Sequence, residues 1–356
     1  MSLAFEGSAH VDHAVAVLRA GVVARDLCRR GGRAEVAAVF DRCLYLRMSE
    51  EFICIGEAAI GNGPTTLIVA AGVAQLGVRQ GQCAFVTAQS IMINGVLFDL
   101  ADCETWRASR WPALPSPATL VAACADIAAR AAAESPAESL ARAAFGTDAT
   151  PFARLARPRL AKFEAWMISS LSTGSRGDAA AETLAPSLPP FAKRMAGRVA
   201  SEASRVGGLS FLFAPSNAFQ EPPTPDPSPP RFAWGEGNPE ACASGLVGLG
   251  PGLTPAGDDF LAGAVAALDA LGRGNIRAAL ARAVLAASGR TSPLSASLLR
   301  TAGAGHVGEN FHTMVAAVIG GDAEAAITTA KRIGHTSGWD ALAGTVVTVS
   351  IVATQS

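Results

Sequence analysis

The hydrophobic pattern at the start of the chain changes from a helical to a strand-like period. Apolar residues recur at near-helical spacing between residues 12 and 30, and Gly31-Gly32 follow, which predicts one amphipathic helix that ends at the glycines. Short runs rich in β-branched and aromatic residues come next, each bounded by Gly, Pro or charged positions. These runs predict strands at residues 39–48, 52–55, 65–70 and 83–87.

The strongest turn signal lies in residues 91–98, IMINGVLF. Asn94-Gly95 separates two apolar runs, and both central residues of a type I′ turn need a positive φ, so this stretch predicts a β-hairpin. Residues 33–108 are therefore expected to form an antiparallel sheet or a small barrel.

From residue 115 the pattern becomes helical. Ala-rich stretches predict helices at residues 118–134, 138–145, 160–171 and 191–203, whereas the proline-rich residues 215–239 predict an extended loop. Residues 241–356 are again helical, with glycines at the helix starts. The expected class is α+β, with an N-terminal antiparallel β-sheet or small barrel followed by a mainly α-helical C-terminal part. The expected divisions are 1–110 (β-rich), 111–213 (helical connection), 214–240 (Pro-rich loop) and 241–356 (helical, with Gly-rich motifs).

Composition excludes several classes of protein. The 356 residues are 50% hydrophobic and 17% charged with a net charge of -1, which argues against a disordered protein and against a general nucleic-acid binder. The seven cysteines include no CxxC spacing, so we expect no zinc knuckle or disulfide framework, but a cytoplasmic protein in a reducing compartment. No signal peptide is expected. The uncharged residues 341–356 are shorter than the about 20 residues of a membrane span.

A glycine-rich stretch, GLGPGLTPAGDDFLAG at residues 248–263, precedes an apolar helical pattern. Thr254 is expected to cap that helix, with Pro255 in its first turn. Glycines allow the backbone to approach a ligand, and the unpaired N–H groups of a helix start attract an anion. The loop contains no lysine, so it is not a P-loop.

A second segment, GHTSGWDALAG at residues 334–344, repeats this design. Residues 257–265 and 338–346 share the pattern G-x-D-x-L-A-G-x-V, which predicts two closely packed helix starts. Asp259 and Asp340 then belong to one shared site, or they only complement the dipoles of their own helices, an effect of about 0.3–1 kcal/mol each.

A third helix start follows Arg290. Ser292 is the expected cap, and Ser295 offers a hydroxyl near the same end. Arg290 is either a bidentate anion clamp or an ordinary surface arginine, and the sequence leaves both open. His335 is the histidine best placed for general acid or base catalysis, with a capping or packing role as the alternative.

The three motifs GLGPGLTPAGDDFLAG, TSPLSASLLRTAGAGH and GHTSGWDALAG, in this order, resemble the family of the AllH-type subunit of oxamate carbamoyltransferase over about residues 244–350. The resemblance implies a subunit that acts with two other proteins in anaerobic allantoin breakdown, a branch of purine catabolism. In that reaction a carbamoyl group is exchanged between oxalurate and phosphate, which gives oxamate and carbamoyl phosphate. For this chain it implies related carbamoyl or acyl-phosphate chemistry.

Motifs and resemblance together predict a transferase, or a subunit of one, that holds a small anion at helix N-termini. The expected partners are this substrate and other subunits of a complex, without nucleic acid or membrane, and a homo-oligomer stays open. Mg²⁺ at Asp258 and Asp259 is the cofactor considered. The alternatives are a non-catalytic binding or assembly subunit and a Mg²⁺-dependent hydrolase or lyase. The expected catalytic residues are His335, Asp259 and Asp340, and the expected binding residues are Gly250, Gly252, Thr254, Gly257, Asp258, Arg290, Ser292, Ser295, Thr336, Ser337 and Gly338.

Overall fold

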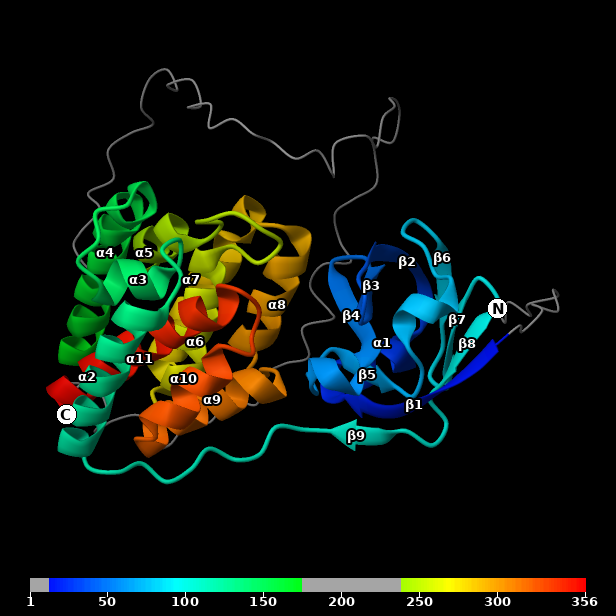
Figure 1. The fold of residues 1–356 in the computed structure, drawn as a ribbon, viewed down its shortest axis with the longest axis horizontal. Helices are drawn as coiled ribbons and strands as arrows, with labels where there is room; N and C mark the ends of the chain where they lie inside the picture. The colour runs from blue at the N-terminus through cyan, green and yellow to red at the C-terminus, as the bar shows by residue number, and fades with distance from the viewer. Residues whose placement is uncertain (1–12, 175–237) are drawn as a thin grey trace, which may run out of the picture. The chain divides into compact units, whose positions relative to one another are not determined.

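The computed structural model describes residues 13–174 and 238–356 (Figure 1). The described strands and helices belong to one compact unit. The predicted helix at 191–203 and nearly all of the predicted proline-rich loop lie outside the described residues. The predicted α+β class is confirmed, because the strands precede residue 107 and helices dominate the rest.

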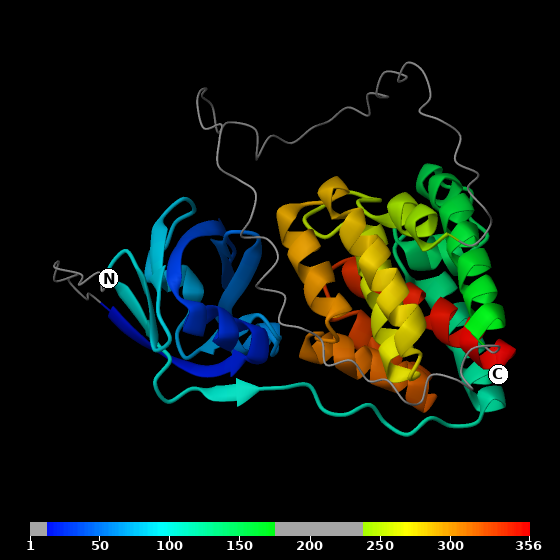
Figure 2. The same ribbon diagram turned by 180° about the vertical axis from the view of Figure 1, so that it is seen from behind.

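The N-terminal part is a closed β-barrel with one extra strand. The strand order is β5-β4-β3-β2-β6-β7-β8-β1-β9, and β5 also pairs with β1, which closes the first eight strands into a ring. Figure 2 shows the short β9 arrow beyond the barrel. The strands are β1 (His13–Gly21), β2 (Gly32–Val39), β3 (Cys43–Met48), β4 (Glu51–Glu57), β5 (Thr66–Val69), β6 (Cys83–Val86), β7 (Ser90–Ile93), β8 (Val96–Asp99) and β9 (Glu104–Trp106).

The predicted single helix over residues 12–30 is wrong in its first half. Residues 13–21 form β1, and the helix α1 is limited to Val22–Arg30. Val15 and Val17 alternate into the barrel core, whereas Leu18, which a helical pattern would bury, is 46% exposed. The apolar pattern of residues 13–21 is compatible with a helix or a strand, and the closure of the barrel determines that these residues form a strand. The predicted stop is confirmed at Gly31, whose φ is 61°.

The predicted hairpin is confirmed, but the sheet is not wholly antiparallel. Asn94 and Gly95 have φ angles of 45° and 82°, and β7 and β8 pair in antiparallel register around them. However, β1 runs parallel to β8 and β9, and β4 runs parallel to β5. Alternating residues determine which face of a strand is buried, but they carry no information about the direction of its neighbour.

The helices share one hydrophobic core. Its buried residues come from the helices before the undescribed segment as well as from those after it, so the described part of the predicted connecting region packs with the C-terminal helices. The helices are α2 (Pro117–Glu134), α3 (Leu140–Phe145), α4 (Pro151–Gly174), α5 (Pro239–Leu246), α6 (Ala256–Ala270), α7 (Gly274–Ala286), α8 (Pro293–Gly303), α9 (Glu309–Gly320), α10 (Ala323–Ala330) and α11 (Ser337–Gln355).

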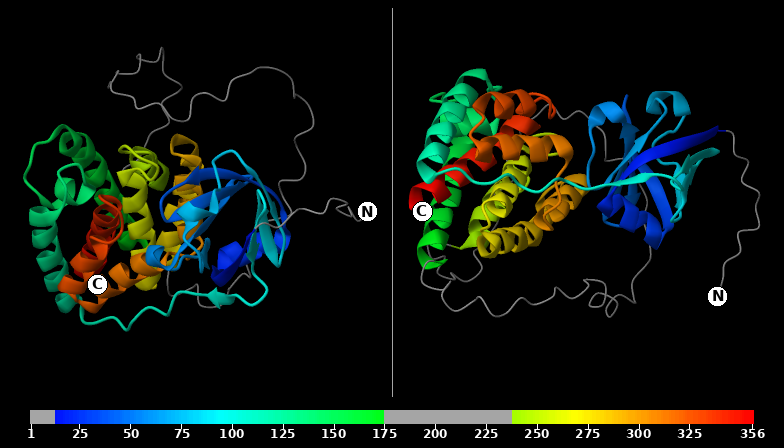
Figure 3. Two further views of the ribbon diagram at one scale, coloured as in Figure 1. Left: turned by 45° about the vertical axis from the view of Figure 1, so that its right-hand side comes forward. Right: turned by 90° about the horizontal axis from the view of Figure 1, so that it is seen from below.

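Helix α11 lies within this core and contacts α2, α3, α6, α9 and α10. Figure 3 shows it in red among the other helices. It is the one described helix that is long and apolar enough to cross a membrane, yet 78% of its most apolar window is buried inside the protein. Its apolar composition is thus explained by packing between helices.

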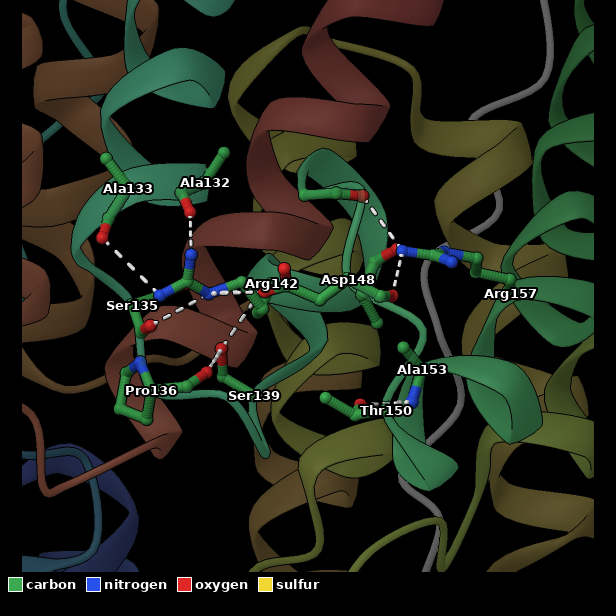
Figure 4. Close-up of polar contacts among 12 residues, drawn as sticks. Ala132, Ala133, Ser135, Pro136, Ser139, Arg142, Asp148, Thr150, Ala153 and Arg157 are labelled. Carbon is green, nitrogen blue, oxygen red and sulfur yellow. Dashed lines mark hydrogen bonds and ion pairs between the residues drawn. The ribbon is translucent and has the colours of Figure 1, made fainter.

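A polar network fixes the start of α3 against the end of α2 (Figure 4). Ser139 caps α3 by accepting from the amide of Arg142 at 3.2 Å. The Arg142 guanidinium also forms an ion pair with Asp148 at 3.5 Å. The same guanidinium donates to the carbonyls at the C-terminal end of α2, those of Ala132, Ala133 and Ser135. These bonds satisfy acceptors that the helix end leaves unpaired, and they place the amide of Leu140 for a contact with α11.

Candidate functional site

The two helices that carry the repeated motif pack against each other reciprocally. A Cβ added to Gly263 in α6 would lie 2.1 Å from the carbonyl oxygen of Ala341, and one added to Gly344 in α11 would lie 1.9 Å from that of Phe260. The motif alignment makes the two glycines equivalent, and likewise the two carbonyls. The contact is therefore symmetric, and it confirms the prediction that the two helix starts pack closely.

The first glycine of each motif also lies against backbone. A Cβ on Gly257 would lie 1.9 Å from the oxygen of Leu246, and one on Gly338 would lie 2.0 Å from that of Ala330. No side chain fits either position without a backbone shift. Both glycines are thus explained by the close approach of the preceding segment rather than by a ligand.

The predicted Thr254 cap of α6 is wrong, and the start of α11 has no side-chain cap either. Pro255 occupies the N-cap position of α6 and Thr336 that of α11, and neither makes a side-chain capping bond. The hydroxyl of Thr254 instead lies 3.2 Å from that of Ser337. This contact brings the starts of the two helices together.

A cavity of about 610 Å³ adjoins these helix starts. Three of the predicted site residues line it: Thr254, Asp259 and Ser337. The helical part also contributes the exposed guanidinium of Arg332 and the half-buried imidazole of His306. The barrel contributes a wall that contains Cys43, Tyr45, Cys54 and Asn62.

Asp259 is the carboxyl group of α6 at this cavity. Its Oδ2 atom is buried without a hydrogen-bond partner among the described residues. Burial raises the pKa of Asp259 well above its usual range, and the charges of Asp340 and Asp258 add to that effect, whereas hydrogen bonds from Ser337 and Thr254 oppose it. A protonated Asp259 can donate one hydrogen bond and accept another.

Asp340, the equivalent residue of α11, has a different environment. It is fully buried, and its Oδ1 accepts from the backbone N–H of Leu140 at 2.5 Å. The pKa of Asp340 is raised to about 7, chiefly by burial and to a smaller extent by the charge of Glu138, against the opposing hydrogen bonds from Leu140 and Thr336. Asp340 therefore joins α11 to the start of α3 and is not part of the cavity lining.

Asp258 is a structural residue. Its Oδ1 accepts from the amide of Gly248 at 2.8 Å, and its Oδ2 accepts from the hydroxyls of Ser295, at 2.6 Å, and Thr291. These bonds tie the glycine-rich loop to the start of α8. With its oxygens already bound to three donors, Asp258 does not fit the predicted role of a Mg²⁺ ligand. Within residues 13–174 and 238–356, no group of three or more His, Cys, Asp or Glu side chains is arranged to hold a metal ion.

The second half of the third motif lines the cavity, at Leu298, Thr301, Ala302 and His306, but its start does not supply the predicted anion clamp. Ser292 caps α8 as predicted, since it accepts from the amide of Ser295 at 3.0 Å. Arg290 is exposed and lies outside the residues that line the cavity. Gly250 and Gly252, with φ angles of 106° and 103°, shape the loop before α6.

His335 is placed on the surface. Its side chain is 81% exposed and lies 3.2 Å from a carboxylate oxygen of Glu138. The histidine of the cavity wall is His306, where burial and then the charge of Arg107 lower the pKa. The structure thus separates His335 from the predicted companions Thr254, Asp259 and Ser337.

Sequence reasoning missed the contact that joins barrel and helices at the cavity. Glu309 at the start of α9 accepts from the backbone and side-chain amides of Asn62, at 2.9 and 2.6 Å. The backbone N–H of Glu309 donates to the carbonyl of Asn62 at 2.8 Å. The only local signal is the glycine pair around Asn62, in which Gly61 has a φ of 78°.

These features define a class of protein: an α+β chain in which a closed barrel and a helical core with an internally repeated helix pair line one cavity. Residues 246–349 match the family described as oxamate carbamoyltransferase subunit AllH, and residues 14–105 match the family described as AllH family N-terminal domain. The chain belongs to the AllH family. The family name implies a carbamoyltransferase subunit in purine catabolism, with further subunits in a complex. No curated protein and no solved structure matches the chain.

Proposed function

We propose that this chain is a substrate-binding subunit of a carbamoyltransferase and that the cavity beside α6 and α11 takes small anions with a carbamoyl or amide group. The observation that carries the proposal is that Asp259, whose Oδ2 has no hydrogen-bond partner among the described residues, lines a cavity that also contains Arg332. A buried polar atom without a partner is costly, by about 1–3 kcal/mol, unless a ligand supplies the missing bond. The cavity therefore favours a ligand that hydrogen-bonds to a carboxyl group.

Two groups of the cavity lining suit the two ends of one ligand. A protonated Asp259 donates to a carbonyl oxygen and accepts from an amide NH₂, so it complements a carbamoyl group. Arg332 offers a guanidinium for a carboxylate or phosphate. The hydroxyls of Thr254 and Ser337 provide further hydrogen bonds. Oxalurate, oxamate and carbamoyl phosphate each combine an amide with an anionic end.

A volume of about 610 Å³ is in the range of pockets for drug-sized ligands, so it has room for two small substrates at once. Transfer requires this proximity: a phosphate oxygen attacks the carbamoyl carbon of oxalurate, the C–N bond breaks, and the phosphate proton moves to the oxamate nitrogen. We assign this proton transfer to His306, because its lowered pKa keeps the imidazole neutral at pH 7.

A thermal-shift screen with oxalurate, oxamate, carbamoyl phosphate and phosphate tests the proposal. Stabilisation of the wild-type chain, with affinity reduced about 10-fold in both Asp259→Asn and Arg332→Gln, is the expected result. Arg290→Gln is the matched control, since it removes an exposed arginine outside the cavity lining. Equal binding by wild type and both cavity variants would refute the site.

The second candidate is a non-catalytic binding or assembly subunit, which the description of the family as a subunit favours. Absence of any shift with the isolated chain, followed by binding once partner subunits are added, would support this candidate.

We also propose that the protein acts in the cytoplasm. All seven cysteines are free thiols, which is usual in a reducing compartment.

A further inference from the structure

Asn62 is a buried polar residue on the barrel side of the cavity. It lies in the connection between β4 and β5, is 7% exposed, and lines the cavity together with its neighbours Gly61 and Gly63. Its Oδ1 atom is buried without a hydrogen-bond partner among the described residues. Asn62 and Asp259 are therefore two lining residues that each carry an oxygen whose hydrogen bond the described part of the protein does not supply.

The contact with Glu309 determines which atom of the Asn62 amide remains for another partner. Nδ2 of Asn62 donates to Oε2 of Glu309 at 2.6 Å, and the backbone N–H of Asn62 donates to the same oxygen at 2.9 Å. A carboxylate only accepts hydrogen bonds, so the NH₂ end of the amide must lie toward Glu309, and Oδ1 is the atom left over. Turning the amide over would break a hydrogen bond to a charged group, which is stronger than a bond between neutral groups.

An acceptor that is held in one orientation selects its partner by chemistry. An amide NH₂ group offers two N–H donors, whereas a methyl group offers none and a carboxylate oxygen is itself an acceptor. A site built to bond a ligand N–H rejects an analogue that lacks this group, because the polar atom of the site then stays unpaired. The Oδ1 atom of Asn62 therefore favours a ligand with an N–H group.

We propose that Asn62 is a specificity-determining residue of the cavity, whose Oδ1 accepts one N–H of the carbamoyl or amide group of the ligand. Glu309 is the positioning residue that keeps this oxygen available, and the second N–H of the ligand is left for the carboxyl group of Asp259. The inference rests on the proposed function, because it takes the cavity that contains Asp259 and Arg332 as the ligand site. It adds that the barrel distinguishes an amide from other groups of the same size.

Oxamate and pyruvate are the ligands that test the acceptor. They have the same charge and nearly the same shape, and they differ in an NH₂ group against a methyl group. Isothermal titration of the full chain should give at least about 10-fold tighter binding of oxamate. Asn62→Leu replaces the amide by an apolar group of similar size, and it should reduce this preference about five-fold because only Asp259 then accepts from the NH₂ group.

Glu309→Gln tests the positioning role while Asn62 stays in place. Glutamine offers a donor as well as an acceptor, so the Asn62 amide can turn over and present its NH₂ end to the ligand. Oxalate has a carboxylate in place of the amide of oxamate. Its affinity relative to that of oxamate should therefore rise about five-fold over the wild-type ratio. A contact that only holds the barrel loop would lower the affinity for both ligands equally.

Asn310→Leu is the matched control. Asn310 also lines the cavity, but in the described structure it has no buried side-chain atom without a partner. Both affinity ratios should therefore stay within about two-fold of wild type. Changes in this control as large as those in Asn62→Leu would contradict the role of Asn62.

Thermal unfolding reports whether each variant is folded. Glu309→Gln changes an exposed residue and decides the matter if Asn62→Leu is not folded. Oxamate binding that depends on Asp259, with neither ratio changed in the folded variants, would overturn this inference alone. No binding of oxamate to the wild-type chain would overturn it together with the proposed function.

Discussion

The starts of α6 and α11 have the same motif and nearly the same backbone contacts, but their acidic residues serve different purposes. Asp259 lines a cavity, whereas Asp340 is enclosed and accepts from the amide of Leu140, although the Oδ2 atom of each lacks a hydrogen-bond partner among the described residues. The difference comes from the neighbouring elements, since α3 encloses Asp340 whereas Asp259 lies in the cavity lining. A repeated motif thus specifies how two helices pack, and the surroundings of each helix decide which of the two aspartates lines the cavity.

The largest expected effect is a pH-dependent change in stability in Asp340→Asn. The folded-state pKa of about 7 lies above the usual 3.8, so the folded protein holds this proton more tightly. The contribution of this proton to the stability of the folded protein is complete below pH 4 and is lost as the pH rises to 7. Since one pKa unit corresponds to about 1.4 kcal/mol, the ionised carboxyl costs on the order of 4 kcal/mol above pH 7.

Asparagine keeps an acceptor for Leu140 without this cost. Chemical denaturation should therefore find the Asp340→Asn variant near wild type at pH 4 and more stable than wild type at pH 8. A stability difference that does not change with pH would show that Asp340 titrates normally, and the contrast with Asp259 would then lose its electrostatic basis.

The second prediction concerns the symmetric contact of the two helices. Gly263→Ala and Gly344→Ala each push a methyl group into a backbone carbonyl of the other helix, so each should destabilise the protein by about 3 kcal/mol. Gly320→Ala in α9 is the matched control, because an added Cβ there meets nothing within 4 Å. Thermal unfolding measures all three. If only one of the two substitutions destabilises the protein, the two halves of the α6–α11 contact are not equivalent.

The third prediction separates the two carboxyl groups by ligand binding. Asp259→Asn should weaken binding of oxamate about 10-fold, equal to about 1.4 kcal/mol, whereas Asp340→Asn should leave it within about two-fold of wild type. Isothermal titration at pH 7 provides the comparison. Equal losses in both variants would mean that the two aspartates act as one site after all.

The smallest effect is expected for His335→Ala. This side chain is largely exposed, and surface ion pairs contribute about 0–1 kcal/mol. Both the unfolding temperature and oxamate affinity should stay close to wild type, whereas His306→Ala should abolish most carbamoyl transfer in the assembled complex. Loss of transfer in His335→Ala would return the catalytic role to the surface histidine.

The sequence predicts local structure correctly where that structure depends only on a residue and its neighbours in the chain. The Asn94-Gly95 turn, the Gly31 helix stop and the Ser292 cap follow from backbone requirements within a few residues. Residues 13–21 were misassigned because their strand exists only through pairing with β5, β8 and β9, which are distant in sequence.

The site was predictable only in part for the same reason. The repeated motif identified Asp259 and its helix, but no pattern in the sequence distinguishes it from Asp340. Asn62 and Glu309 are 247 positions apart, so their contact leaves no local trace. Arg332 lies outside the three motifs and His306 is the last residue of the third, and only the cavity relates these side chains to Asp259.

The central position of α11 has a consequence for biosynthesis. This helix follows every other described helix in chain order, yet α2, α3, α6, α9 and α10 all pack against it. Chains emerge from the ribosome N-terminus first, so the earlier helices present uncovered apolar surface until α11 has been made. That interval is when a chaperone would encounter the nascent chain, because the helical core is complete only once α11 has been made.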